Sequence, residues 1–279
     1  MNPIIFKSFA KVNIGLQIRD QRSDGYHTIH TLFQELAFHD SITLERRDSG
    51  CKFSSNVDWL KNDESNLCVK AWQTIVDNFG IGGVSIELEK RIPAGAGLGG
   101  GSSNAATVLK GLRQLYEINI TDDELEKLGV NLGADVPFFI RGCMQTGDGI
   151  GEKLTPLETK IPGTFLLVVP DIHIDTKWAY SASKKILDAS REMVNFTGFI
   201  QRENIPFELF ENDFEAIVVP AYPEIGQIKD SLRGQGARFA SLSGSGSTVF
   251  GIFDEEADAL SAESTFFSHY NTFISYPNL

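Results

Sequence analysis

The stretch PAGAGLGGGSS at residues 93–103 carries most of the information about the fold. Residues 84–88, before it, alternate apolar and polar side chains, which is typical of a half-buried strand. An apolar stripe at helical spacing follows it from Ala105 to Leu115. Its five glycines leave backbone amides free of side chains, and the start of a helix adds positive potential. The pattern therefore predicts a loop that cradles an anion such as a phosphate.

Two common glycine loops compete for this stretch. Gly95, Gly97 and Gly100 match the G-x-G-x-x-G pattern of dinucleotide-binding proteins, so an NAD-dependent dehydrogenase is an alternative. That pattern belongs to the first turn of a doubly wound parallel sheet, whereas here a mainly β segment of about ninety residues precedes it. The Walker pattern is excluded, because no lysine precedes Ser102.

Composition limits the function further. The chain has 279 residues, 42% of them hydrophobic, and a formal net charge of −12, which favours a folded protein and disfavours a nucleic-acid partner. No stretch approaches the roughly 18 apolar residues of a membrane span, and the N-terminal stretch does not resemble a secretory signal. The three cysteines are far apart in sequence and form no metal or redox motif. We expect a cytoplasmic protein without a membrane partner.

Periodicity predicts an α+β fold. Strands are expected at 4–9, 12–19, 32–36, 41–45, 84–88, 165–169 and 248–253. Helices are expected from Cys68 to Phe79 with a stop at Gly80, over 105–115, after Thr176 and over 224–232. Thr121 and Glu124 predict a capping box for a further helix that ends at Gly133. The second half should pack its helices on one sheet.

The glycine stretch resembles the signature of the GHMP kinase family, Pro-x-x-x-Gly-Leu-Gly-Ser/Gly-Ser-Ser-x-Ala. Three other segments resemble family motifs in the same order: AKVN at 10–13 with DGYH at 24–27, LGADVPFF at 132–139, and SGSG at 243–246. The resemblance implies a two-domain fold. We expect an N-terminal mixed α/β domain with a predominantly antiparallel sheet over 1–155 and a ferredoxin-like α+β domain over 156–279.

The run GLGGGSSNAA at 97–106 resembles the branch of this family that phosphorylates the alcohol cytidine diphosphate methylerythritol. The resemblance implies transfer of a phosphoryl group from ATP to the 2-hydroxyl in the non-mevalonate route to isoprenoids, with Mg²⁺ accompanying the nucleotide. The phosphates would supply most of the magnesium ligands, so no metal-ligating residue is assigned. Alternatives are a kinase for homoserine, mevalonate or a sugar, and a small-molecule sensor without catalysis. The oligomeric state stays open.

Two residues have catalytic roles by resemblance. Asp135 is implied as the base that takes the hydroxyl proton, although an aspartate beside a helix end often caps a turn. Lys11 by pattern alone is a solvated surface lysine. The resemblance makes it the partner of Asp135 that stabilises charge on the transferred group. Asn13 faces the same side of a strand as Lys11 and is implied to bind the alcohol, although a polar strand residue is an equal interpretation.

The implied cytidine site consists of Tyr26, His27, Thr176 and Tyr180. Tyr26 would stack on the cytosine and His27 would bond its polar edge. Tyr180 would form the opposite wall, with Trp178 as the alternative ring. A surface tyrosine is the simpler interpretation of Tyr26.

The implied ATP site involves three segments. Asn66 and Leu67 would contact the adenine, although Asn66 is also a good N-cap for the following helix. The phosphates would bind Pro93, Gly95, Gly97, Leu98, Gly99, Gly100, Gly101, Ser102 and Ser103, and the two serines are also suited to cap the helix. Gly244 and Gly246 would allow close backbone approach, or would form an ordinary turn. Gly147, Gly149 and Gly151 predict a turn near the domain junction.

Overall fold

The computed structural model describes residues 3–184 and 191–278. The chain forms two compact units that interleave along the sequence. Unit 1 comprises Met1–Ala10, His39–Ala94 and Gly99–Gly142, and unit 2 comprises Lys11–Phe38, Gly95–Leu98 and Cys143–Leu279. The boundary expected between residues 155 and 156 stays a prediction.

The first two strands are longer than the sequence suggested. β1 (Ile4–Gln21) and β2 (His27–Arg47) each replace two predicted strands, and the predicted loop around Asp24 joins them. Lys11 interrupts the apolar pattern of β1 but lies inside the strand and is buried, so the pattern break does not end the strand. Both strands contribute residues to both units.

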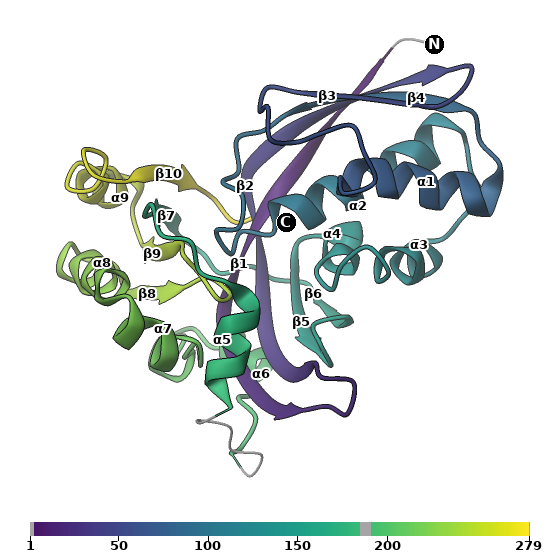
Figure 1. The fold of residues 1–279 in the computed structure, drawn as a ribbon. Helices are drawn as coiled ribbons and strands as arrows, with labels where there is room; N and C mark the ends of the chain where they lie inside the picture. Colours follow the sequence, from purple (N-terminus) through teal and green to yellow (C-terminus); the bar gives the residue numbers. More distant parts are fainter. Residues whose placement is uncertain (1–2, 185–190, 279) are drawn as a thin grey trace. The chain divides into compact units, whose positions relative to one another are not determined.

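In unit 1, helices cover a small sheet. β4 (Gly83–Glu89) pairs antiparallel with β2, Glu89 opposite Ser41, and parallel with β3 (Cys51–Ser55). Figure 1 shows the helices of this unit, α1 (Leu67–Phe79), α2 (Gly100–Leu115), α3 (Asp122–Gly129) and α4 (Val136–Arg141). α1 and α2 lie side by side, and α4 packs against α2 and α3.

The helix ends confirm most of the predicted caps in unit 1. α1 begins after Asn66 and ends at Gly80, whose φ of 62° is left-handed and favours glycine. The capping box of Thr121 with Glu124 is present. The prediction that this helix continues to Gly133 is wrong, because α3 ends at Gly129 and the chain turns into α4. Proline near the start of a helix supplies a preset φ, and Pro137 does so in α4.

Unit 2 contains a hairpin and a second sheet. β5 (Met144–Asp148) pairs antiparallel with β2 and with β6 (Lys153–Leu157). The turn between β5 and β6 contains Gly149 and Gly151, as expected, whereas Gly147 lies in β5 opposite Thr31 and is not part of the turn. The second sheet has the order β10-β7-β9-β8 and is antiparallel throughout. Its strands are β7 (Thr164–Val169), β8 (Phe239–Leu242), β9 (Val249–Phe253) and β10 (Asn271–Ser275).

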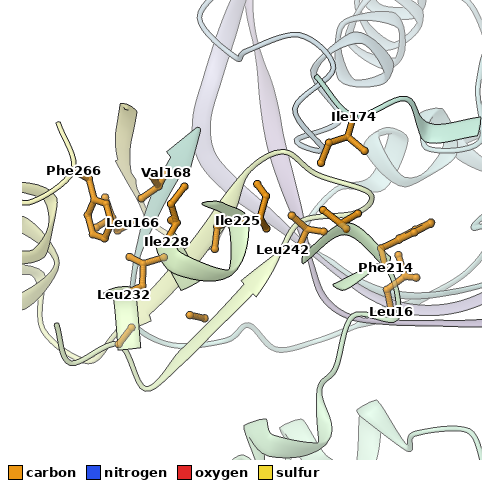
Figure 2. Packing of buried hydrophobic residues seen from close by; sticks show 14 of the residues in the cluster. Leu16, Leu166, Val168, Ile174, Phe214, Ile225, Ile228, Leu232, Leu242 and Phe266 are labelled. Atoms are coloured by element: carbon orange, nitrogen blue, oxygen red, sulfur yellow. The ribbon is translucent and has the colours of Figure 1, made fainter. Parts of the chain in front are cut away.

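The helices of unit 2 are α5 (Thr176–Ser183), α6 (Phe196–Ile200), α7 (Glu215–Ala221), α8 (Pro223–Gly234) and α9 (Glu256–Glu263), with a 3₁₀ turn at Phe207–Leu209. α8 and α9 pack on the second sheet. In Figure 2, Ile225, Ile228 and Leu232 of α8 meet Leu166 and Val168 of β7. The α+β architecture with helices on a sheet is therefore confirmed. Within 3–184 and 191–278, no helix combines the length and apolarity needed to cross a bilayer.

Candidate active site

The first turn of α2 is the part of the glycine stretch that lies in unit 1. Gly99 is the N-cap residue with a φ of 70°, and the helix begins at Gly100. Ser102 and Ser103 therefore lie inside the first turn, and the prediction that they cap the helix is wrong. Ser103 instead bonds the hydroxyl of Ser8 at 2.8 Å. This arrangement leaves the backbone amides at the helix start without a capping side chain.

A buried aspartate fixes the flanks of this stretch. Oδ1 of Asp40 accepts the N–H groups of Arg91 and Ile92, at 2.6 and 2.7 Å. Oδ2 accepts from Nζ of Lys90 at 2.6 Å and from the carboxamide of Asn104 at 2.8 Å. Burial lowers the pKa of Lys90, and the Asp40 charge opposes that shift. One fully buried carboxylate thus connects the residues before the loop with the first turns of α2.

Asp135 is half-buried at the N-cap position of α4, and its side chain makes no capping hydrogen bond. The expected position of Asp135 at a helix end is confirmed, and its role as base stays a prediction. Asn66 is the N-cap of α1: Oδ1 accepts the N–H of Cys68 at 2.9 Å, and Nδ2 donates to the Lys61 carbonyl. The capping interpretation of Asn66 is confirmed, and contact of Asn66 and Leu67 with adenine stays a prediction.

In unit 2, Lys11 and Asn13 form a buried polar chain. Nζ of Lys11 donates to Oδ1 of Asn13 at 2.7 Å, and Nδ2 of Asn13 donates to the hydroxyl of Thr31 at 2.8 Å. The Thr31 hydroxyl in turn donates to the Gly15 carbonyl at 2.7 Å. Lys11 is 4% exposed and lies over the ring of Phe33. The two side chains share one face of β1, as predicted, and Lys11 is not the surface lysine that its pattern alone suggested.

The middle of the glycine stretch, residues 95–98, meets the motif at 243–246 within unit 2. Ser243 donates its hydroxyl to the Gly97 carbonyl at 2.9 Å, and the Lys11 N–H donates to the Leu98 carbonyl at 3.0 Å. A Cβ atom on Gly97 would lie 2.1 Å from the Ser243 carbonyl oxygen, so only glycine fits. A Cβ on Gly244 would lie 3.5 Å from Oδ1 of Asn13 and 3.7 Å from Nζ of Lys11. Two segments of bare backbone therefore adjoin a buried ammonium group.

The predicted aromatic residues of unit 2 differ in their contact with His27. Tyr180 stacks on the imidazole with ring centroids 5.0 Å apart and planes 19° apart. Trp178, the alternative ring, instead meets Tyr222 edge-on. Tyr26 is 61% exposed on the hairpin between β1 and β2. The structure brings Tyr180, rather than Trp178, into contact with His27.

The imidazole of His27 has an unused polar atom. Nε2 is buried and has no hydrogen-bond partner within the described part of the chain. Burial lowers the pKa of His27 below its ordinary 6.5, with the Lys184 charge as a second cause, so the ring is neutral at pH 7. A buried polar atom without a partner costs free energy, which a ligand could recover. The predicted Thr176 bonds Ser245 of the glycine motif at 3.0 Å between hydroxyl oxygens.

Several residues around these groups escaped the sequence analysis. Asp40, Thr31 and Asn212 are buried polar residues that bond the predicted ones or their backbone. The sequence could have pointed to Thr31, because it lies four residues after His27 in the same strand and alternate side chains of a strand share one face. Asp40 and Asn212 act over separations of 51 and 32 residues, which no local pattern records.

Comparisons with known protein families agree with this layout. The family model of the GHMP kinases N terminal domain matches residues 66–143, and that of the GHMP kinases C terminal matches residues 202–272. A 4-diphosphocytidyl-2-C-methyl-D-erythritol kinase from Chlorobium chlorochromatii (strain CaD3) is 41% identical over 279 residues, covering 96% of this chain and 95% of the relative. The kinase of the same name from Prosthecochloris aestuarii (strain DSM 271 / SK 413) is also 41% identical, over 93% of this chain and 92% of its own length.

Solved structures give the same result at the level of the fold. The crystal structure of a 4-(cytidine 5'-diphospho)-2C-methyl-D-erythritol kinase matches with a TM-score of 0.86 and 33% identity, covering 99% of this chain and 100% of that one. The mevalonate kinase of Methanococcus jannaschii matches with a TM-score of 0.75 and 14% identity, over 100% of this chain and 99% of its own. At that identity the second match concerns the fold alone.

Proposed function

Since the chain belongs to the GHMP kinases and, among them, to the 4-diphosphocytidyl-2-C-methyl-D-erythritol kinases, we propose that it phosphorylates the 2-hydroxyl of this cytidyl alcohol. ATP is the phosphoryl donor, and the products are the 2-phosphate of the cytidyl alcohol and ADP. The reaction supplies the non-mevalonate route to isoprenoid precursors. The observation that carries the proposal is the buried Lys11 ammonium group beside Gly244 and the Leu98 peptide, because a cation next to bare backbone suits a phosphoryl group.

Phosphoryl transfer requires positioning, neutralisation of charge and an acceptor for the hydroxyl proton. The alcohol oxygen forms a bond to the γ-phosphorus while the bond from that phosphorus to the β–γ bridging oxygen breaks. Asp135 takes the proton of the alcohol, and Lys11 stabilises negative charge on the transferred group. Asn13, whose carboxamide is held by Lys11 and Thr31, orients the alcohol.

The nucleotide phosphates bind the glycine stretch from Pro93 to Ser103. Support comes from the uncapped start of α2, where backbone N–H groups and the helix dipole attract anions. Asn66 and Leu67, at the start of α1, contact the adenine. Gly244 and Gly246 keep the second glycine motif free of side chains where it approaches the reacting groups.

Magnesium fits the oxygen donors of this site. Mg²⁺ takes most of its ligands from phosphates and water and needs one or two protein oxygens at most. Unit 1 offers the Ser102 hydroxyl as one such oxygen, and the part of the chain that the structure describes has no cluster of three His, Cys, Asp or Glu suited to a metal. The ion would neutralise phosphate charge during transfer.

The cytosine binds beside His27. Neutral Nε2 of His27 is a buried atom in need of a hydrogen bond, and the polar edge of cytosine offers both donors and acceptors. Tyr180 holds the imidazole from one side, and exposed Tyr26 provides a face for stacking. Thr176, next to the glycine motif through Ser245, completes this group.

The dehydrogenase alternative has less support. A dinucleotide fold places its glycine loop after the first strand of a parallel sheet, whereas β4 pairs antiparallel with β2. A kinase for mevalonate or homoserine shares the fold, but neither alcohol carries a nucleobase to bond Nε2 of His27, which is buried and has no hydrogen-bond partner among the residues that the structure describes.

One assay tests the proposal. Purified protein is incubated with ATP, Mg²⁺ and the cytidyl alcohol, ADP release is followed by a coupled assay, and phosphorus NMR identifies the product. We expect ADP release that depends on the alcohol, together with a new phosphomonoester signal. Equal release with mevalonate or homoserine would contradict the assigned alcohol, and NADH binding without ATP binding would support the dehydrogenase.

A further inference from the structure

We infer that residues 212–215 form a positioning element that holds three separate parts of the substrate side of unit 2 in place. The inference rests on the proposed function, in which Lys11 and Asn13 serve the reacting alcohol and His27 serves the cytosine. None of residues 212–215 has a role in the binding or chemistry described above. Their contacts reach the glycine motif, strand β1 and the Tyr180 ring.

Asn212 fixes the backbone of the glycine motif. Its side chain is 2% exposed, and Nδ2 donates to the carbonyls of Leu242 at 2.7 Å and Gly244 at 2.8 Å. Its Oδ1 accepts the N–H of Phe214 at 3.0 Å, which makes a local turn. Since Gly244 adjoins Lys11 and Asn13, the carboxamide sets where the backbone lies against the polar pair.

Glu215 bonds the residues just before the glycine motif. Oε1 accepts the N–H of Leu242 and the hydroxyl of Ser241, both at 2.9 Å, and Oε2 pairs with Lys229. The Leu242 peptide unit therefore has its carbonyl bonded by Asn212 and its N–H bonded by Glu215. A backbone bonded on both sides has little freedom to shift before the glycines.

Asp213 ties this element to the strand that carries Lys11 and Asn13. Its N–H donates to the Leu16 carbonyl at 2.9 Å, and Oδ2 accepts the N–H of Ile18 at 2.7 Å. Leu16 and Asn212 form a parallel bridge. The relative position of β1 and the glycine motif within unit 2 is thus set by consecutive residues of one segment.

Phe214 supports the aromatic rings. It is 1% exposed and meets Tyr180 edge-on, with centroids 4.9 Å apart and planes at 78°. Tyr180 in turn stacks on His27. Figure 2 shows Phe214 beside Leu16 in the core of this unit.

The element therefore has two arms with different kinetic consequences. Asn212 acts on the backbone next to the reacting groups, so its loss should lower kcat. Phe214 supports Tyr180, which stacks on His27 beside the proposed cytosine site, so its loss should raise the KM for the cytidyl alcohol. A segment that only stabilised the fold would not separate these two constants.

Two variants test the arms. Asn212→Asp keeps Oδ1 for the Phe214 N–H but loses both bonds to the glycine motif; we expect kcat to fall about tenfold or more, with the KM for the alcohol within about threefold. Phe214→Leu should raise that KM about fivefold, with kcat within about threefold. Asn212→Ser, which adds no charge, should repeat the loss of kcat if Asn212→Asp does not fold.

Ile228→Val is the matched control, because it shortens a side chain of the same core that lies on α8. Melting temperatures place all variants on one scale of stability. We expect Ile228→Val to leave kcat and the KM for the alcohol within about twofold, even if its melting temperature falls as far as those of the Asn212 and Phe214 variants. The inference would be overturned if the Asn212 and Phe214 variants changed kcat and KM in the same way as each other. It would also be overturned if the changes in all variants followed their melting temperatures.

NMR keeps the inference testable without catalysis. Asn212→Asp should shift the Gly244 amide signal and leave the His27 ring signals in place, and Phe214→Leu should do the reverse. Identical shifts in both variants would reject the two arms. If the wild-type protein is inactive but the two variants shift the Gly244 and His27 signals separately as expected, the proposed reaction is rejected and the positioning element is retained.

Discussion

The ammonium group of Lys11 donates a 2.7 Å hydrogen bond to Oδ1 of Asn13. Because the cation claims the oxygen of the carboxamide, Nδ2 must turn toward Thr31, which accepts it. The orientation of Asn13 is therefore set by a charge two residues away on the same strand. A buried lysine thus has one role in the structure and a second, proposed role in the reaction.

Lys11→Met should nearly abolish activity with little effect on stability. The substitution removes the charge and keeps the length of the side chain, and we expect kcat to fall about 100-fold or more. Relief of the buried charge offsets the lost hydrogen bond, so the free energy of unfolding should change by about 1 kcal/mol or less. Steady-state kinetics and urea unfolding measure both, with exposed Lys7→Met as the control. A kcat within about tenfold of wild type would contradict the role of Lys11.

Asp135→Asn should slow the chemical step and spare nucleotide binding. The amide keeps the shape of the carboxylate but cannot take the hydroxyl proton, so kcat should fall by about 1000-fold while the KM for ATP stays within about threefold. Asp77→Asn, on the exposed face of α1 in the same unit, is the control. A similar loss of ATP affinity in the Asp135 variant would mark a structural residue.

The affinity for the cytidyl alcohol should depend on pH through His27. Burial holds the pKa of His27 below 6.5, so the neutral ring prevails at higher pH and the KM should rise only as pH falls through the lowered pKa. The sign is the same for stability: the unfolded state binds the proton more readily, so acid weakens the folded state. KM against pH and an NMR titration of the ring test this, and His27→Gln should remove the dependence. A KM that already rises between about pH 8 and pH 7 would contradict it.

Tyr26→Ala should raise the KM for the cytidyl alcohol about tenfold and leave the KM for ATP unchanged, because in the proposed function the ring stacks on the cytosine only. Trp178→Ala is the matched comparison, since Trp178 contacts Tyr222 instead of His27. We expect little change in the second variant. Initial rates with each substrate varied in turn measure the two constants, and equal effects on both substrates would exclude a stacking role for Tyr26.

Asp40→Asn should destabilise unit 1. The variant leaves Lys90 as a buried ammonium group without its counter-charge, and breaking such a pair costs about 3–5 kcal/mol. Lys90→Met in the Asp40→Asn background should recover part of that loss, because it removes the unpaired charge. Urea unfolding of the wild type, the two single variants and the double variant gives the coupling. A loss below about 1 kcal/mol for Asp40→Asn would show that the pair contributes little.

Local sequence signals predicted both ends of α1 and the start of α3, but they missed the end of α3, the start of α2 and the lengths of the first two strands. Each of these caps joins residues no more than four positions apart: Asn66 bonds Cys68, Gly80 bonds Val76, and Thr121 bonds Glu124. The local sequence therefore contains all the information needed to predict them. The length of β1 depends instead on what buries Lys11, and Asn13 and Phe33 do so. A charge in an apolar pattern therefore suggested a strand end where the structure has none.

By itself the sequence determined the glycine stretch, its strand and helix, the α+β class and the family, because periodicity, glycine positions and motif order are written in the chain. Only the tertiary structure decided that Tyr180 rather than Trp178 meets His27, that Ser102 and Ser103 lie inside α2, and that Asn212 holds Gly244. The contacts of Tyr180 and of Asn212 depend on where distant segments pack, whereas the start of α2 depends on the left-handed backbone at Gly99. The free energy of such contacts comes from burial and hydrogen bonds between residues far apart in sequence, which local patterns do not encode.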